Sequence, residues 1–305
     1  MIKFIFILFV FFYINNSSNA LENFLFIGGD NIEKHKNKIN DKTDGVQIIY
    51  FWKDLEIEKD IYDFSKIEED LKFLYSINKK LWIQIQDRSF SLNNKVVPKY
   101  ILTKEYDNGI ALQEDNPGES KNKGHGWIAK QWNKNTRLRY QKLLYELAKK
   151  FDGKIYGINL PETAIDIDIK KEKRKEFSCN KYFNAEMENI NFIKSVFKES
   201  YVVQYINFWP CEWDNDHKYM SRFFENAIKN KIGLGGPDIV PYKKGQMKNS
   251  YPFFNKYKER LSIVAMAIQE PTRTYTNPKT GKKFTDEEFK NFAIDYLGVN
   301  IIFWS

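Results

Sequence analysis

Apolar and polar positions alternate along this chain in short runs that predict strands and helices in turn. The run 45–52 is apolar almost throughout, as expected for a parallel strand that is covered on both faces. The following segment, 63–78, places Ile67, Leu71 and Leu74 at helical spacing, and Ser65 is a suitable N-terminal cap. Together the two segments predict one strand followed by one helix.

The same alternation continues to the end of the chain. Strands are predicted at 24–27, 45–52, 81–87, 154–162, 201–209, 232–238, 261–270 and 299–304. Helices are predicted at 63–78, 136–150, 182–199, 217–230 and 251–258, and one more begins at Thr285. Eight strands alternating with helices predict an α/β protein, a single (β/α)₈ TIM barrel. The sequence stops just after the eighth strand, so we expect the barrel to end without its last helix.

The first twenty residues have the pattern of a secretory signal peptide. Lys3 precedes an apolar run at 4–14, and Ser18, Asn19 and Ala20 form a small-residue cleavage site. The apolar run is too short to span a bilayer, although an uncleaved anchor is the alternative. We therefore expect one barrel domain over 21–305, exported to the periplasm or the extracellular space and without stable membrane insertion.

One long stretch, about 88–133, has no clear periodicity and is rich in Asn, Gly and Lys. Loops of this length in a compact domain are usually functional or disordered. The aromatic residues Phe90, Trp127 and Trp132 favour a folded lid over a cleft, and the middle of the stretch is the candidate for disorder.

Composition narrows the function classes. Aromatic residues make up 16% of the chain, which suits stacking on sugar rings, although the amino-acid bias of an A/T-rich genome would have the same effect. The net charge is +8, but the basic run 170–175 is too isolated to predict a nucleic-acid site. Cys179 and Cys211 would be able to pair in an oxidising compartment or remain free. No cofactor is implied, and the three histidines fall outside the strand ends, which disfavours a metal-dependent hydrolase.

Two predicted strands end in a glutamate. Glu162 ends the fourth strand and Glu270 ends the seventh. In a TIM barrel, the carboxyl ends of the strands form the active-site face. Burial disfavours a charged carboxylate there, so two such groups predict acid/base and nucleophilic chemistry on a glycosidic bond. The alternative is that both are polar strand caps that face solvent.

Other polar and aromatic residues near the strand ends are candidates for substrate binding. Each is also compatible with a structural role, as a turn cap, a member of a polar core network or a packing residue. The candidates are Trp52, Gln86, Asp87, Arg88, Asn159, Gln204, Tyr205, Asn207, Trp209, Asp238 and Trp304.

The segment 45–64 resembles the strand-two region of clan A glycoside hydrolases, especially the TIM-barrel β-galactosidases. The matching residues are Trp52, Leu55, Glu56, Tyr62, Asp63 and Phe64. The resemblance implies that the acid/base is Glu162, at the end of strand four, and the nucleophile Glu270, at the end of strand seven. It also implies an aromatic residue at the end of strand eight, matched by Trp304. In the clan, an asparagine directly precedes the acid/base, whereas here Asn159 stands three residues before Glu162.

These observations predict an exported glycoside hydrolase that acts on an oligo- or polysaccharide with two glutamates. A retaining mechanism requires the two carboxyl groups to lie about 5–5.5 Å apart, whereas inversion requires about 6.5–9.5 Å. The alternative prediction is an exported carbohydrate-binding barrel without catalytic activity.

Overall fold

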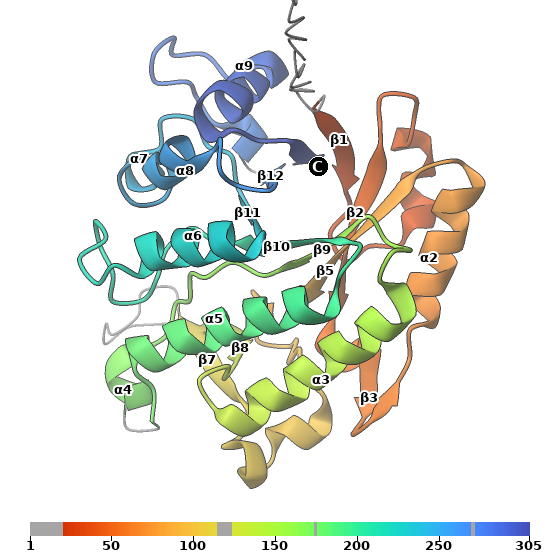
Figure 1. The fold of residues 1–305 in the computed structure, drawn as a ribbon, viewed down its shortest axis with the longest axis vertical. Helices are drawn as coiled ribbons and strands as arrows, with labels where there is room; N and C mark the ends of the chain where they lie inside the picture. The colour runs from red at the N-terminus through yellow and green to blue at the C-terminus, as the bar shows by residue number, and fades with distance from the viewer. Residues whose placement is uncertain (1–20, 115–123, 174–175, 270–271) are drawn as a thin grey trace, which may run out of the picture.

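The computed structural model describes residues 21–114, 124–173, 176–269 and 272–305. Eight parallel strands close into a barrel in the order β1-β13-β12-β11-β10-β9-β5-β2 (Figure 1). Their bounds are β1 Glu22–Phe26, β2 Gly45–Phe51, β5 Lys80–Gln86, β9 Gly157–Leu160, β10 Tyr201–Tyr205, β11 Gly233–Gly236, β12 Val264–Ile268 and β13 Ile301–Trp304. The predicted TIM barrel is therefore confirmed. The predicted signal segment, 1–20, lies outside the described residues.

Helices cover the outside of the barrel (Figure 1). The longer ones are α2 Ser65–Ser76, α3 Lys134–Phe151, α5 Cys179–Val196, α6 Tyr219–Asn230, α7 Lys244–Asn249, α8 Tyr251–Tyr257 and α9 Asp286–Asn291, which runs on into a π-helical segment, Phe292–Leu297. Thr285 caps α9 in a capping box with Glu288. The two shorter α-helices are α1 Trp52–Leu55 and α4 Ile169–Lys173, and 3₁₀ segments lie at Ile32–Lys38, Lys99–Leu102, Lys104–Tyr106 and Thr272–Thr274. In the described part of the chain, no helix combines the length and apolarity needed to cross a bilayer.

The barrel interior is filled in layers. Phe24, Trp82 and Phe303 pack edge to face near the amino end of the strands. Above them, Asn159 Oδ1 accepts hydrogen bonds from Trp82 Nε1 and Gln47 Nε2, each at 2.9 Å. Because these side chains fill the lower part of the barrel, only its carboxyl end is open to a ligand.

The stretch 88–133 differs from the sequence expectation, because it contains a three-stranded sheet; a two-stranded sheet, β3 Glu56–Glu58 with β4 Ile61–Tyr62, also lies outside the barrel. Strands β6 Arg88–Ser89, β7 Ile110–Glu114 and β8 Gly124–Ala129 form an antiparallel sheet in the order β6-β8-β7. Gly126 faces Ser89 so closely that a Cβ would lie 1.8 Å from the Ser89 carbonyl oxygen. Short strands with a glycine at the crossing point leave little periodicity in the sequence, which is why the pattern suggested an irregular loop.

Cys179, the first residue of α5, forms a disulfide with Cys211, which follows β10. The sequence had left this pairing open. The bond ties the loop after the fifth barrel strand to the helix before it.

The disulfide is expected to contribute to stability. It spans 32 residues of sequence, and closing a loop of this size restricts the unfolded chain. Replacing both cysteines with serine is expected to lower the free energy of unfolding by about 2–4 kcal/mol, measured by urea denaturation. A reducing agent should destabilise the native protein and leave the double-serine variant unchanged; equal stability of the oxidised native protein and the variant would contradict this expectation.

Candidate active site

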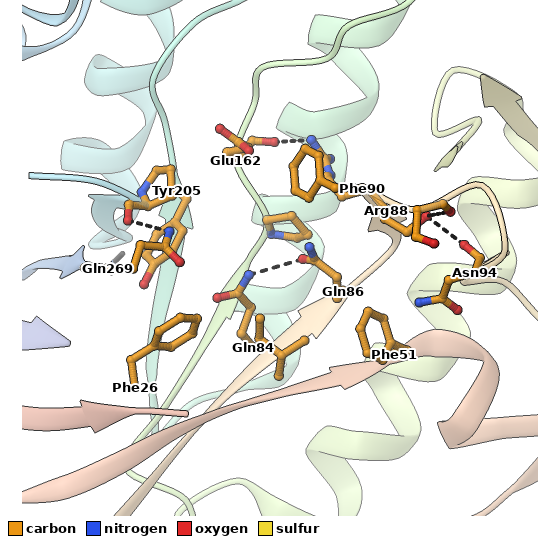
Figure 2. Close-up of a pocket in the computed structure, with 16 residues that line it drawn as sticks. Phe26, Phe51, Gln84, Gln86, Arg88, Phe90, Asn94, Glu162, Tyr205 and Gln269 are labelled. Atoms are coloured by element: carbon orange, nitrogen blue, oxygen red, sulfur yellow. Dashed lines mark hydrogen bonds between the residues drawn. The ribbon is translucent and has the colours of Figure 1, made fainter. Parts of the chain in front are cut away.

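A cavity of about 410 Å³ opens at the carboxyl end of the barrel strands (Figure 2). Four of the predicted site residues line it: Gln86, Arg88, Glu162 and Tyr205. Aromatic walls are provided by Phe26, Phe51 and Phe90. The remaining lining residues are Ile49, Gln84, Ser89, Ser91, Asn94, Pro161, Pro237, Ala267 and Gln269. Among the described residues that line the cavity, Glu162 is the one carboxylate.

Glu162 follows β9 and Pro161, at the mouth of the barrel, and is only partly exposed. Asn207 Nδ2 donates a hydrogen bond to Glu162 Oε2. The Asn207 amide is itself held in place, because its Oδ1 accepts hydrogen bonds from the backbone N–H groups of Ala164 (3.1 Å) and Phe208 (2.8 Å). The predicted residues Glu162 and Asn207 therefore form one fixed hydrogen-bonded pair.

Burial raises the pKa of Glu162 above its ordinary value. The positive charge of Arg88 and the Asn207 hydrogen bond oppose this shift, whereas the negative charges of Asp238 and Asp166 add to it. The protonated form of Glu162 therefore persists to higher pH than that of an exposed glutamate. A carboxyl group whose pKa is raised in this way is suited to act as a general acid.

Removing the Asn207 amide is expected to shift the pH dependence of any reaction in which Glu162 donates a proton. The hydrogen bond stabilises the charged carboxylate, so its loss in Asn207→Ala should raise the pKa of Glu162 further. Activity falls when the acid loses its proton, so the alkaline limb of the rate profile should move to higher pH. Asn94→Ala, in the same cavity, is the control and should leave this limb in place. A shift to lower pH for Asn207→Ala would contradict the assignment.

Arg88 connects Glu162 to the barrel wall. Its side chain is almost fully buried, and its Nε donates to Asp87 Oδ1 at 3.1 Å. Its Nη1 donates to the backbone carbonyl oxygens of Glu162 and, at 3.0 Å, of Ala164. Gln131 Nε2 donates a hydrogen bond to the other carboxylate oxygen, Asp87 Oδ2, at 2.7 Å. Asp87 therefore lies behind Arg88 and does not line the cavity. Arg88 thus fixes the backbone that carries Glu162.

A further acid that the sequence did not suggest lies behind this pair. Glu186, on α5, is buried, and burial together with the negative charge of Asp87 raises its pKa to about 8. Its position on a helix, rather than at a strand end, gave no signal in the sequence.

The floor of the cavity is lined by amide and phenol groups. Tyr205 Oη accepts a hydrogen bond from Gln47 Nε2 at 2.9 Å, and Gln84 Nε2 donates to Gln86 Oε1 at 3.2 Å. Gln269, which the sequence analysis missed, follows β12 and donates to the Pro237 carbonyl oxygen at 2.8 Å. Two more of the predicted ligands, Asn159 and Gln204, lie outside the lining. Asn159 is buried in the barrel interior beneath the cavity, and Gln204 donates to the Pro161 carbonyl oxygen.

None of the three tryptophans that were candidates for substrate binding lines the cavity. Trp52 is buried, donates to Glu56 Oε2 at 2.9 Å and packs on Tyr140. Trp209 is buried against Phe183 on the outside of the barrel. Trp304 follows the inward-facing Phe303, so it points outward, where its Nε1 donates to Asn23 Oδ1 at 3.0 Å. The three residues have packing or hydrogen-bonding roles in the structure.

The remaining candidates at the strand ends are Asp238 and Glu270. Asp238 follows Pro237 and accepts a hydrogen bond from Thr272 Oγ1 at 3.3 Å; burial raises its pKa. It does not line the cavity, although its charge acts on Glu162. Glu270 lies outside the described residues, so its distance from Glu162 stays a prediction. Over the described ranges, no three or more His, Cys, Asp or Glu side chains are grouped so that they could hold a metal ion.

This chain is similar in fold to several proteins of known structure. No family model and no curated protein sequence matches this chain. The catalytic domain of a β-amylase from Paenibacillus polymyxa is similar in structure, with a TM-score of 0.59 and 9% identity over 94% of this chain and 92% of that one. A β-galactosidase from Halorubrum lacusprofundi has a TM-score of 0.58 and 9% identity over 93% of this chain and 52% of that one. This chain therefore spans about half the length of that β-galactosidase.

A xylanase, Xyn10A from Cellvibrio japonicus, has a TM-score of 0.55 and 10% identity over 94% of this chain and 87% of that one. At these identities, the three likenesses establish the fold. They agree with the resemblance that the segment 45–64 carries. The chain therefore has the single (β/α)₈ barrel fold seen in clan A glycoside hydrolases.

Proposed function

We propose that this protein is an exported glycoside hydrolase that cleaves a glycosidic bond in an oligo- or polysaccharide. The observation that carries the proposal is Glu162, a partly buried carboxyl group at the end of the fourth barrel strand, which faces the cavity and is held by Asn207. Its raised pKa supports the role of general acid.

In the proposed retaining mechanism, Glu162 protonates the leaving glycosidic oxygen. Glu270 attacks the anomeric carbon and forms a glycosyl-enzyme ester, which requires the two carboxyl groups to lie about 5–5.5 Å apart. Glu162, now ionised, then removes a proton from the water that hydrolyses the ester and so regains its own proton. Arg88 is a positioning residue, because it holds the backbone of Glu162.

The cavity supports a sugar as the ligand. Its volume of about 410 Å³ lies within the range of small-molecule sites, which is about 300–1,000 Å³. The faces of Phe26, Phe51 and Phe90 provide apolar walls for the C–H faces of a sugar ring. The amides of Gln86 and Gln269 provide donors and acceptors for its hydroxyl groups.

Export is supported by the Cys179–Cys211 disulfide, because disulfides form and persist in oxidising compartments. Edman sequencing of the protein recovered from outside the cytoplasm tests this part of the proposal. A mature N-terminus near Leu21 is expected, whereas a chain that retains residues 1–20 in the cytoplasm would contradict it.

A carbohydrate-binding barrel without catalytic activity is the second candidate. It is favoured by the position of Asn159, which stands three residues before Glu162, whereas the clan resemblance implies an asparagine directly before the acid/base. To separate the two functions, the protein is incubated with a broad panel of glycans, and hydrolysis is measured by the release of reducing ends. Turnover that is lost in Glu270→Gln supports the hydrolase; turnover retained in Glu270→Gln refutes the two-glutamate mechanism, and binding without turnover supports the second candidate.

A further inference from the structure

A second cavity, of about 880 Å³, opens beside the first at the same end of the barrel. One of its walls comes from the segment that follows β2, and the other from the segment that follows β5. Four lysines line it, namely Lys53, Lys59, Lys95 and Lys99, and it is called the lysine groove below.

The lysine groove and the first cavity are lined by neighbouring residues of the same two chain segments. Phe51 and Asn94 line the first cavity, whereas Lys53 and Lys95, close to them in sequence, line the groove. Lys53 Nζ donates a hydrogen bond to Asn94 Oδ1 at 2.7 Å and so joins the two segments. A chain of sugars that has one unit beside Glu162 is therefore able to continue over this bridge into the groove.

The lysine groove carries an excess of positive charge. Two acids, Asp54 and Glu58, also line it, so the lysines outnumber the carboxylates. Lys59 is paired with Glu105 at 3.6 Å, but Lys95 lies over the ring of Trp127. Across the described ranges, neither Lys95 nor Lys99 forms an ion pair with a carboxylate. Both are exposed and are available to a negatively charged ligand.

Apolar side chains lie between the lysines. Ile57 is 54% exposed and Leu92 is 48% exposed, which is unusual for aliphatic residues of this size. Tyr100 and Leu102, which are partly exposed, extend the apolar surface. A ligand that suits the groove therefore combines apolar faces with negative charge. Sugars that carry a carboxylate or sulfate group have both properties, whereas a neutral sugar would leave the lysines without partners.

We propose that the lysine groove binds the anionic part of a glycan that bears carboxylate or sulfate groups, and that such a glycan is the substrate. This inference rests on the proposed function, since it places the neighbouring sugar of the same chain in the cavity beside Glu162. It narrows the substrate class from glycans in general to acidic polysaccharides.

Binding is tested with the Glu162→Gln variant, so that hydrolysis does not consume the ligand. The probes are oligogalacturonides, which carry carboxylates, dextran sulfate oligosaccharides, which carry sulfates, and neutral xylo-oligosaccharides and galacto-oligosaccharides. Poly-glutamate provides a polyanion without sugar. We expect one of the two acidic glycans to bind at least about tenfold more tightly than the neutral ones and than poly-glutamate, with an affinity that falls as salt is added. Which acidic glycan binds distinguishes carboxylate from sulfate.

The lysines are tested by adding Lys95→Gln and Lys99→Gln to the same variant. Exposed charge pairs contribute little individually, so we expect binding of the acidic glycan to weaken by about three- to tenfold, with no change for neutral glycans. The matched control is Lys198→Gln with Lys229→Gln, which removes the same charge from exposed positions at the opposite end of the barrel. This control should bind as the parent does.

Several results would overturn the inference. Equal affinity for acidic and neutral glycans, binding of poly-glutamate as tight as that of the acidic glycan, equal loss in both double variants, or no binding of any glycan would each do so. Hydrolysis of neutral glycans by the native protein, without binding of acidic ones, would refute the inference and leave the proposed function standing. Binding of an acidic glycan through Lys95 and Lys99 without turnover would support the groove as a binding site, and would refute both the hydrolase and the acidic glycan as its substrate.

Discussion

Glu162→Gln is expected to lower kcat/KM on a glycoside with a poor leaving group by about 10²–10⁴-fold, the usual contribution of a general acid. Glutamine keeps the size of the side chain and can still contact Asn207, but it has no proton to donate to the glycosidic oxygen. On an aryl glycoside whose phenol leaves easily without protonation, the loss in kcat/KM should be much smaller. The measurement is kcat/KM for the variant on both kinds of substrate, because this constant covers only the steps up to formation of the ester, whereas kcat also includes the later step in which Glu162 acts as the base.

The matched control is Glu259→Gln, which neutralises an exposed glutamate outside the cavity and should leave kcat/KM unchanged on both substrates. A loss of equal size on good and poor leaving groups would show that Glu162 does not act as the acid. Full activity of Glu162→Gln would refute the proposed mechanism.

Arg88→Met is expected to lower the free energy of unfolding by about 3–5 kcal/mol, because it leaves a buried charge without its partner. Arg88 and Asp87 are each only 2% exposed, and the Arg88 guanidinium also serves two backbone carbonyl groups. Methionine fills a similar volume but provides no hydrogen-bond donor. Denaturation in urea measures the loss.

Two comparisons make this result specific. Lys150→Met breaks an exposed ion pair with Glu68 and should cost at most about 1 kcal/mol. Adding Asp87→Asn to Arg88→Met removes the unpaired charge and should restore part of the lost stability. A loss below about 1 kcal/mol for Arg88→Met would contradict the role of Arg88 as the partner of a buried charge. The same conclusion would follow if the loss in the double variant equalled the sum of the losses in Arg88→Met and Asp87→Asn alone.

The barrel was predictable because its strands are buried on both faces, which leaves long apolar runs in the sequence. The run 45–52 became β2, and only its last residue, Trp52, moved into the helix α1. Glu162 was predictable for a related reason, since a carboxyl group directly after such a run lies at the open end of the barrel.

The walls of the site were harder to predict, because they depend on which face of each strand turns inward. Phe303 and Trp304 are neighbours in the sequence, yet Phe303 fills the barrel and Trp304 lies outside it. The sequence position of an aromatic residue near a strand end therefore does not show whether its side chain points into the barrel or away from it, until the register of that strand is known. Phe90 and the lysines of the groove belong to segments without periodicity, so only the folded chain brings them to the site.

The barrel closes between strands that are far apart in the sequence. β13 pairs with β1, where Glu22 lies opposite Ile301, and the other six barrel strands lie between these two in the sequence. Contacts between such distant residues slow folding, because the intervening chain must first be brought into place. During synthesis the ring therefore remains open until β13 has been made, and β1 has no partner on that side until then.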